Sequence, residues 1–304
     1  MKKLYFINDE FANSRIDRWF RKTICDVPQS LLEKNIRKGN IKVNNKKPKS
    51  SYKLNKGDQI SVYNINFLKD KHKKKTYKYI PSKSDIKFSS SIFIENNENF
   101  AIINKPAGIA VQSGTKSRKN ILDILSSTKE FENTTPYPVH RIDKDTTGIL
   151  IVAKNRKYAQ LFTTLFRIRK IHKEYLAIII GQLDAKKGTF NDDLITYENN
   201  KKIVNKAITH FKVLDSNNSY SLLKLNPQTG RKHQLRKQLL IRGHPVLGDA
   251  KYNISNSKYF KKNSLMLHAL NINFSISNIK YSFDAKLSNE FVNTLNEKHL
   301  KSFQ

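Results

Sequence analysis

The chain has 304 residues, of which 38% are hydrophobic, and its 57 Lys and Arg against 25 Asp and Glu give a formal net charge of +32. This length suits one large domain with a small one, and the charge favours a polyphosphate partner, RNA or DNA, with an anionic membrane as the alternative. No apolar run could span a bilayer, no signal peptide is expected, and the single Cys25 excludes an internal disulfide, so we expect a cytoplasmic protein.

Two short helices are predicted near the N-terminus. Residues 14–24, SRIDRWFRKTI, have helical spacing, with apolar side chains on one face and basic side chains on another. The predicted apolar face holds Ile16, Phe20, Thr23 and Ile24. Pro28 opens the second helix, and Gly39 is placed as its C-terminal cap. Five basic residues of this region are candidate RNA contacts, although on a single helix such charges could simply solvate it: Arg15, Arg18, Lys22, Arg37 and Lys38.

Two predicted strands complete residues 1–64 as a small α/β-hairpin unit. They cover residues 41–43 and 59–62, with turns at 44–45 and 57–58. The stretch IRKGNIKVNNKKPKSSYKLNKGDQISV resembles the small RNA-binding module of a small-subunit ribosomal protein and of bacterial tyrosyl-tRNA synthetases. This resemblance implies that the unit binds RNA.

Residues 65–90 are predicted to form a basic linker. Within them KDKHKKKTYK, residues 69–78, carries six lysines and has no apolar periodicity. The stretch is interpreted either as a solvated spacer or as an arm that adds phosphate contacts, and the two interpretations are compatible.

Residues 91–304 are predicted to form a second domain of the α+β class, with a mostly antiparallel mixed sheet. The predicted strands are 91–95, 100–103, 109–111, 149–153, 174–180, 208–214, 219–225, 266–274 and 279–285, and the predicted helices are 119–126, 156–169 and 230–241. Strand 149–153 is apolar on both faces, which predicts a central place in the sheet.

A charged cluster, HRIDKD at residues 140–145, directly precedes strand 149–153. Its acids alternate with bases, and a surface turn would explain this pattern without any function. A calcium loop is not favoured because the further oxygen ligands and the terminal Glu are missing. Zinc is not favoured because His140 has no partner at ligand spacing, and a hydrogen-bonded structural role is its simpler interpretation.

Two later segments also carry candidate residues. In PQTGRKHQLRKQLLIRGHPVLGDAKY, residues 227–252, the G-x-x-x-x-G-K pattern of a phosphate-binding loop is absent. His233 and Arg236 lie three residues apart on one helical face, which alone indicates a basic helix that binds phosphate. In HKEYLAIIIGQL, residues 172–183, Tyr175 heads an apolar strand, where a buried aromatic is the simpler interpretation.

Taken together, these segments resemble the RluA/RluC/RluD family of RNA pseudouridine synthases. HRIDKDTTGILIVAKN is similar to the family's HRLDRDTSGLLLVAKN, and TGRKHQLR followed by GHPVLGD is similar to its later motifs in the same order. KEYLAIIIG matches its K-x-Y-x-A-x-x-x-G strand, and NKPAGIAV matches its N-K-P-x-G opening. The resemblance covers nearly all of residues 91–300, and VQSGTKSRKNILDIL looks most like the RluC branch.

The resemblance implies a pseudouridine synthase fold and the conversion of uridine to pseudouridine in RNA, above all large-subunit ribosomal RNA, without metal or cofactor. The family's catalytic aspartate corresponds to Asp143. Because desolvation raises a carboxyl pKa, a cation is needed beside it, and the family's arginine corresponds to Arg236, so we expect an Asp143–Arg236 ion pair. Tyr175 is expected against the face of the flipped uracil and is a candidate for the final proton removal.

The same resemblance suggests further substrate contacts in this domain. Arg141 is expected to fill the gap left by the flipped base or to hold the displaced strand, and Leu247 is expected to form an apolar wall of the pocket. The remaining candidates for substrate binding are His140, Arg231 and His233.

Two alternatives stay open. The first is a non-catalytic RNA-binding ribosome-assembly factor that has kept the fold, against which the intact Asp143, Tyr175 and Arg236 argue. The second is a hydrolase that releases RNA bases, for which a second acid within reach would be expected, and none is identified. In either case we expect a monomer.

Overall fold

The computed structural model describes residues 2–63, 79–82, 84–86, 91–113, 119–198, 201–254 and 264–301. The chain divides into two compact units, Met1–Tyr77 and Lys78–Gln304. The whole of the lysine-rich stretch 69–78 lies within residues 64–78, outside the described residues. No helix in the described part of the chain is both long and apolar enough to cross a membrane.

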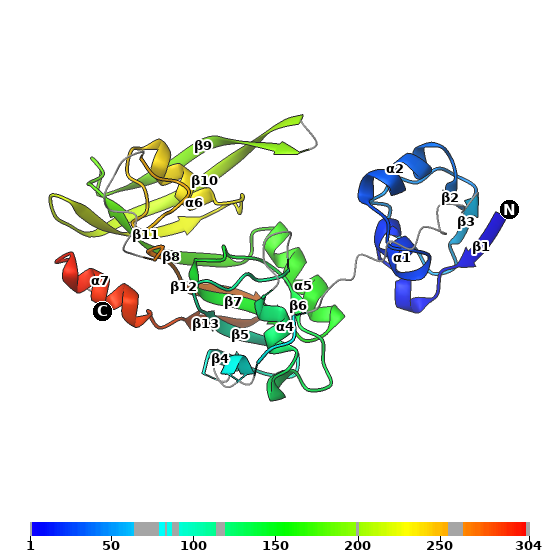
Figure 1. The fold of residues 1–304 in the computed structure, drawn as a ribbon, viewed down its shortest axis with the longest axis horizontal. Coiled ribbons are helices and arrows are strands. Elements are labelled where there is room, and N and C mark those ends of the chain that lie inside the picture. Colours follow the sequence, from blue (N-terminus) through cyan, green and yellow to red (C-terminus); the bar gives the residue numbers. More distant parts are fainter. Residues whose placement is uncertain are drawn as a thin grey trace. The chain divides into compact units, whose positions relative to one another are not determined.

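The first unit is a three-stranded antiparallel sheet with two helices (Figure 1). The strand order is β1-β3-β2, and the two predicted helices and two predicted strands are present. The edge strand β1 was not predicted, because KKLYF lacks a clear alternation of apolar and polar residues. The elements are β1 (Lys2–Phe6), α1 (Ile16–Thr23), α2 (Gln29–Arg37), β2 (Ile41–Val43) and β3 (Gln59–Tyr63).

The core of the first unit is built mainly from the apolar face of α1. Ile16 and Phe20 are fully buried, as predicted, and Trp19 joins them with 2% of its surface exposed. The prediction was wrong for Thr23, which is exposed in the last turn of the helix. The buried face is therefore turned toward Trp19, whose large ring removes more apolar area from water than a threonine methyl group does.

The second unit is a mixed, mostly antiparallel sheet with helices packed on it, so the predicted α+β class is correct (Figure 1). The strand order is β4-β5-β7-β12-β8-β11-β10-β9, β6 pairs with β7, and β13 pairs with β12. The strands are β4 (Phe93–Asn96), β5 (Phe100–Lys105), β6 (Tyr137–Pro138), β7 (Thr147–Ala153), β8 (His172–Ile180), β9 (Lys187–Glu198), β10 (Lys201–Ser216), β11 (Tyr220–Pro227), β12 (Leu267–Ile276) and β13 (Ile279–Asp284). The helices are α4 (Ile121–Leu125), α5 (Arg156–Arg167), α6 (Gln234–Ile241) and α7 (Asn289–Glu297).

Strand β7 is central, as its apolar sequence predicted, and every one of its residues is buried. Its side chains alternate between two hydrophobic clusters, as the twofold period of a strand requires. Ile149 and Ile151 pack in the cluster that contains Phe162 of α5, whereas Leu150 and Val152 pack in the cluster that contains α4. The strand therefore forms a rigid base for the charged residues that precede it.

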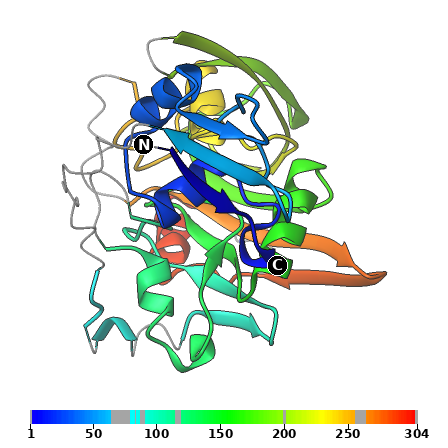
Figure 2. The ribbon, with the colours of Figure 1, turned by 90° about the vertical axis from the view of Figure 1, so that its right-hand side faces the viewer.

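Several element boundaries differ from the predictions. Residues 109–111 do not form a strand, and Ala110 makes only an isolated bridge to Asn120. The long β9–β10 hairpin was predicted only in part, because β9, KGTFNDDLITYE, is mostly polar, and α7 was not predicted (Figure 1). The hairpin of β12 and β13, orange in Figure 2, was predicted.

The described part of residues 79–86 packs on the second unit. The Tyr79 N–H donates to the Asp123 carboxylate at 3.1 Å, and Lys119 pairs with Asp85 at 2.5 Å. These residues, which were assigned to the linker, therefore belong to the structure of the second unit.

Gly148 allows β7 to approach β12 closely at their parallel contact. Its φ is +102°, and a Cβ atom there would lie 2.2 Å from the Ala269 carbonyl oxygen. We expect Gly148→Ala to destabilise the protein by more than about 2 kcal/mol, since a left-handed φ alone costs about 1–2 kcal/mol for an L-residue and the backbone clash adds to it. Calorimetric unfolding of the full chain measures the loss.

Gly243→Ala is the matched control. Its φ is +77°, but a Cβ atom there would meet nothing within 4 Å. This variant should lose only the conformational term, about 1 kcal/mol. Equal losses in the two variants would show that the close approach of β7 to β12 does not need glycine.

Candidate active site

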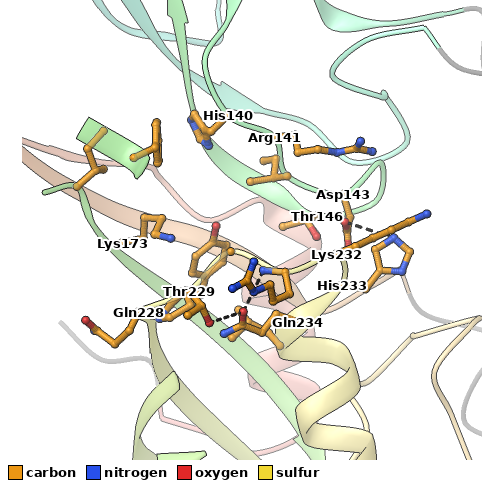
Figure 3. Close-up of a pocket in the computed structure, with 18 of the residues that line it drawn as sticks. His140, Arg141, Asp143, Thr146, Lys173, Gln228, Thr229, Lys232, His233 and Gln234 are labelled. Carbon is orange, nitrogen blue, oxygen red and sulfur yellow. Dashed lines mark hydrogen bonds and ion pairs between the residues drawn. The ribbon is translucent and has the colours of Figure 1, made fainter. Parts of the chain in front are cut away.

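A pocket of about 690 Å³ in the second unit brings the three candidate segments together (Figure 3). Its walls come from the loop before β7, from the end of α5 and the start of β8, and from the turn between β11 and α6. These segments are distant in sequence, but β7, β12, β8 and β11 are consecutive strands of the sheet. The order of the strands thus gathers the motifs at one place.

Asp143 and Arg236 form the predicted ion pair in this pocket. Arg236 Nη1 lies 2.9 Å from Asp143 Oδ2, and the two side chains are 9% and 20% exposed. The pair links the loop before β7 to the first turn of α6. Such a charge-assisted hydrogen bond is shorter and stronger than one between neutral groups.

Asp249 holds the other edge of the Arg236 guanidinium. Its Oδ2 accepts from Nε at 2.6 Å and its Oδ1 accepts from Nη2 at 2.7 Å. The fully buried Asp249 also accepts the backbone N–H groups of Lys251 and Tyr252. Burial opposes the charge of Arg236, but the bonds from Asp249 and Asp143 outweigh it and raise the pKa of Arg236. The guanidinium is therefore fixed, with Nη1 left for Asp143.

Sequence reasoning missed Asp249. It closes the quoted motif GHPVLGD, and an acid at the end of an otherwise apolar, glycine-containing turn was the available signal. Only the fold shows that this acid meets Arg236.

His233 is the second group beside Asp143. Its backbone is left-handed, with φ +54°, at the position just before α6, which is why the helix begins at Gln234 and not at the predicted residue 230. Nε2 lies 3.6 Å from Asp143 Oδ1, and Nδ1 lies 2.8 Å from the Tyr252 hydroxyl. Burial lowers the pKa of His233, against the pull of Asp143, so a neutral imidazole faces the carboxylate at neutral pH.

Hydrogen bonds of the buried Gln234 side-chain amide hold the turn that presents His233 and Arg236. Gln234 Oε1 accepts from the Thr229 hydroxyl at 2.7 Å and from the Arg231 N–H at 3.0 Å. Its Nε2 donates to the Ile208 carbonyl at 3.1 Å. The turn is thereby anchored to β10, so the two side chains beside Asp143 start from a fixed backbone.

Tyr175 lies on β8 where three hydrophobic clusters meet, and its ring lines the pocket. Burial, with Asp143 nearby, raises the pKa of the Tyr175 hydroxyl above its ordinary value. At neutral pH the phenol therefore keeps its proton and can offer an aromatic face and a hydrogen-bond donor. This argues against the expected role in the final proton removal, which needs a phenolate.

His140 lines the pocket but is held as a structural residue. Its Nε2 accepts the backbone N–H of Ile151 at 2.8 Å, and its ring stacks on Phe166 with centroids 4.6 Å apart. Burial, with a smaller effect from Lys173, lowers the pKa of His140 to about 3. Its ring is thus neutral, and the simpler interpretation from the sequence describes it well.

Two predicted arginines lie at the pocket, whereas Leu247 does not. Arg141 and Arg231 line it and are exposed, and Arg231 Nε donates to the Lys206 carbonyl at 3.1 Å. The prediction for Leu247 was wrong, because this residue is fully buried in the core around β8 and its N–H donates to the Ile178 carbonyl. Apart from the ring of Tyr175, the apolar residues that line the pocket are Val139, Ile142, Phe166, Ile171, Pro227, Leu235 and Leu267.

The five basic candidates of the first unit are all exposed. Arg15 pairs with Asp17 at 2.6 Å, and Lys22 pairs with Glu10 at 2.7 Å. Both partners of the Lys22 pair are exposed, so that pair is weak. Asp17 is buried, but the Arg15 side chain is half-exposed, so both cations remain accessible to phosphate. Within the described residues, no group of three or more His, Cys, Asp or Glu side chains could hold a metal ion.

Lys105, from the NKPAG turn, braces the loop that carries Asp143. Its fully buried Nζ donates to the carbonyls of Pro106, Ile109 and Lys144, at 2.6, 3.0 and 2.9 Å. Burial lowers the pKa of Lys105 to about 7, although Asp145 and Asp143 favour the charged form. This lysine was not among the residues predicted for the site.

Removal of the Asp249 charge should destabilise the protein and loosen the site. Asp249→Asn leaves a buried guanidinium with one carboxylate in place of two, and breaking a buried pair costs about 3–5 kcal/mol. Urea unfolding of the full chain measures the change. Asp184→Asn, an exposed carboxylate of the same unit, should change the free energy of unfolding by less than about 0.5 kcal/mol. A loss below about 1 kcal/mol in Asp249→Asn would contradict the structural role.

Two buried neutral imidazoles should make the protein less stable in acid. Burial lowers the pKa of His140 to about 3 and that of His268 to about 4. An unfolded imidazole binds a proton near pH 6.5, so between pH 6.5 and these values the unfolded state holds more protons and stability falls as pH falls. The slope should reach about 1.4 kcal/mol per pH unit for each residue.

The pH dependence of urea unfolding checks this. His268→Gln should flatten the slope above pH 4, whereas His210→Gln, at an exposed position, should leave it unchanged. An unchanged slope in His268→Gln would refute the assignment of this acid sensitivity to His268.

Known proteins resemble this chain in sequence and in fold. Residues 99–240 match the family described as RNA pseudouridylate synthase. A relative from Buchnera aphidicola subsp. Baizongia pistaciae, named ribosomal large subunit pseudouridine synthase C, is 34% identical over 88% of this chain and 88% of its own. A relative of the same name from Vibrio vulnificus is 31% identical over 88% of this chain and 87% of its own.

A solved structure agrees with these relatives. Human RNA pseudouridylate synthase domain containing 4 superposes with a TM-score of 0.63 and 25% identity, over 71% of this chain and 96% of its own. The matching sequence spans the loop with Asp143, the strand with Tyr175 and the first turn of α6 with Arg236. This chain belongs to the RluA/RluC family of RNA pseudouridine synthases, in the RluC branch.

Proposed function

We propose that this protein isomerises uridine to pseudouridine in large-subunit ribosomal RNA, with Asp143 as the catalytic residue. The observation that carries the proposal is the Asp143 carboxylate, paired with the fixed guanidinium of Arg236 in a pocket that Tyr175 also lines. The names of the relatives support the choice of ribosomal RNA. This substrate would be met in the cytoplasm, and the monomeric state stays a prediction.

The isomerisation needs one ionised group at the glycosidic bond. The C1′–N1 bond breaks, the base turns, and a C1′–C5 bond forms, after which C5 loses a proton and N1 carries one. Asp143 could attack the sugar, attack the uracil ring or remove the ribose 2′ proton, and each of these roles requires its carboxylate form. Arg236 Nη1 donates to Asp143 while Asp249 holds Nε and Nη2, so a fixed cation stands beside the carboxylate.

Tyr175 is suited to contact the flipped uracil, and it is not suited to transfer a proton. Its half-buried ring offers a flat apolar face to the flipped uracil, and its protonated hydroxyl can donate a hydrogen bond. We therefore assign it to stacking and orientation.

Base flipping costs a few kcal/mol, which phosphate contacts can offset. Exposed cations are available for this on both units. Arg141 and Arg231 belong to the pocket wall, and the first unit adds the five exposed basic residues named above. We propose that this unit binds RNA that flanks the target uridine.

The hydrolase alternative lacks its second acid. Asp143 is the single Asp or Glu among the residues that line the pocket, and the neighbouring Asp249 is committed to Arg236. A two-carboxylate hydrolytic mechanism therefore finds no partner acid among these lining residues.

Pseudouridine mapping of total RNA from cells with and without the gene tests the proposal, with carbodiimide treatment and primer extension. Loss of discrete sites in large-subunit ribosomal RNA is expected, with restoration by the wild-type gene. Asp143→Asn should restore none of them, and in vitro it should lower the rate by at least about 100-fold. Tyr175→Phe keeps the ring and should lose less.

Asp145→Asn is the matched control, since it removes an exposed acid two residues from Asp143. It should restore every site. An RNA map that does not depend on the gene, or full restoration by Asp143→Asn, would overturn the proposed function.

A further inference from the structure

Lys173 is a half-buried cation in the pocket that has no protein partner. It lies on β8 two residues before Tyr175, so both side chains project from the same face of the strand, and both line the pocket. Figure 3 shows Lys173 there. No hydrogen bond or ion pair joins its ammonium group to any residue that the structure describes. Lys173 is therefore a charged residue of the pocket wall to which the proposed mechanism gives no role.

The groups around Lys173 are neutral or positive. His140 is held neutral by its bond to the Ile151 N–H, and Lys173 itself helps to lower the pKa of His140. Arg167 and Arg169, at the end of α5, are exposed on the same side of the pocket, and the ring of Tyr175 keeps its proton. None of these neighbours can compensate the ammonium charge.

The nearby acids are already engaged. Glu174 bonds Lys224 at 3.0 Å and Asn226 at 3.1 Å. Asp143, the single acid of the pocket wall, is bound by Arg236. The lining contains seven Lys and Arg residues against this one carboxylate: Arg141, Arg167, Arg169, Lys173, Arg231, Lys232 and Arg236.

A partly desolvated ammonium without a counter-ion costs free energy, and burial accordingly lowers the pKa of Lys173. An anion from the substrate would remove that cost, and the anionic group of RNA is the phosphodiester. A uracil carbonyl would offer a hydrogen bond but no compensating charge.

We propose that Lys173 binds a phosphate group adjacent to the flipped uridine and so positions that nucleotide between Tyr175 and Asp143. The inference rests on the proposed function. Lys173 is thus a positioning residue that acts through the RNA backbone, while Arg167 and Arg169 at the outer edge of the same wall can guide the strand toward it.

A double-mutant cycle, in which Lys173 and an RNA phosphate are changed separately and together, tests the contact. The substrate is a stem-loop of large-subunit ribosomal RNA with a uridine that the wild-type protein modifies, and each phosphate flanking that uridine is replaced in turn by a neutral methylphosphonate. Single-turnover kinetics give the half-saturating concentration and the maximal rate. For the wild type, one of these replacements should raise the half-saturating concentration by about 10-fold, as expected for a lost charge-assisted hydrogen bond.

Lys173→Met should show the same loss with unmodified RNA and no further loss with the methylphosphonate, while Lys173→Arg should keep the sensitivity to it. Lys173→Met should also reduce the salt dependence of binding by about one phosphate contact, a slope change of roughly 0.7 for single-stranded RNA. Lys157→Met removes an exposed lysine of α5 that does not line the pocket, and it should respond to the methylphosphonate as the wild type does.

The inference is overturned if the penalties of Lys173→Met and of every flanking methylphosphonate simply add, or if Lys173→Met changes only the maximal rate. Because the RNA replacement leaves the protein untouched, a folding defect in the variant cannot imitate the expected coupling. A wild-type protein that modifies no uridine would instead refute the proposed function, which keeps the two failures distinct.

Discussion

The site depends on how one buried guanidinium is shared between two carboxylates. Asp249 occupies two N–H groups of Arg236 side by side, and Asp143 receives a third. Burying these charges would be costly if any of them lacked a partner, so the arrangement is stable only when it is complete. Asp249 fixes the orientation of the guanidinium, and in that orientation Nη1 donates to Asp143, the acid of the charged cluster 140–145 that lines the pocket. Asp145, two residues away, is exposed.

The sheet brings the two halves of this arrangement together through one row of paired residues. Gly148 on β7 pairs with Ala269 on β12, Ala269 pairs with Tyr175 on β8, and Tyr175 pairs with Leu225 on β11. Neighbouring strands lie about 4.8 Å apart, so Tyr175 sits about 10 Å across the sheet from Gly148. The missing side chain of Gly148 lets β12 approach, and the row therefore sets the spacing between the Asp143 loop and Tyr175.

Much of this could be predicted from the sequence, and the exceptions have physical causes. The apolar residues on both faces of strand 149–153 predicted the central place of β7, and the resemblance carried by the quoted motifs predicted the Asp143–Arg236 pair. The predicted start of α6 was wrong because His233, just before the helix, has a left-handed backbone conformation. Composition does not reveal such a conformation. Leu247 and Asp249 share one motif, yet Leu247 faces the core and Asp249 the guanidinium. Which way such side chains face is decided by packing against strands far away in the sequence.

Charge in the pocket is divided between two tasks. Arg236 is neutralised by its two carboxylates, so it serves the protein, whereas the remaining cations of the wall, from Arg141 to Lys232, lack such partners among the lining residues. A pocket with excess positive charge attracts RNA and also favours the ionised form of any acid within it. The same excess would leave less of a carboxylic acid in the protonated form that a proton donor needs. A site with this balance is therefore suited to a carboxylate that acts in its charged form on a polyanionic substrate.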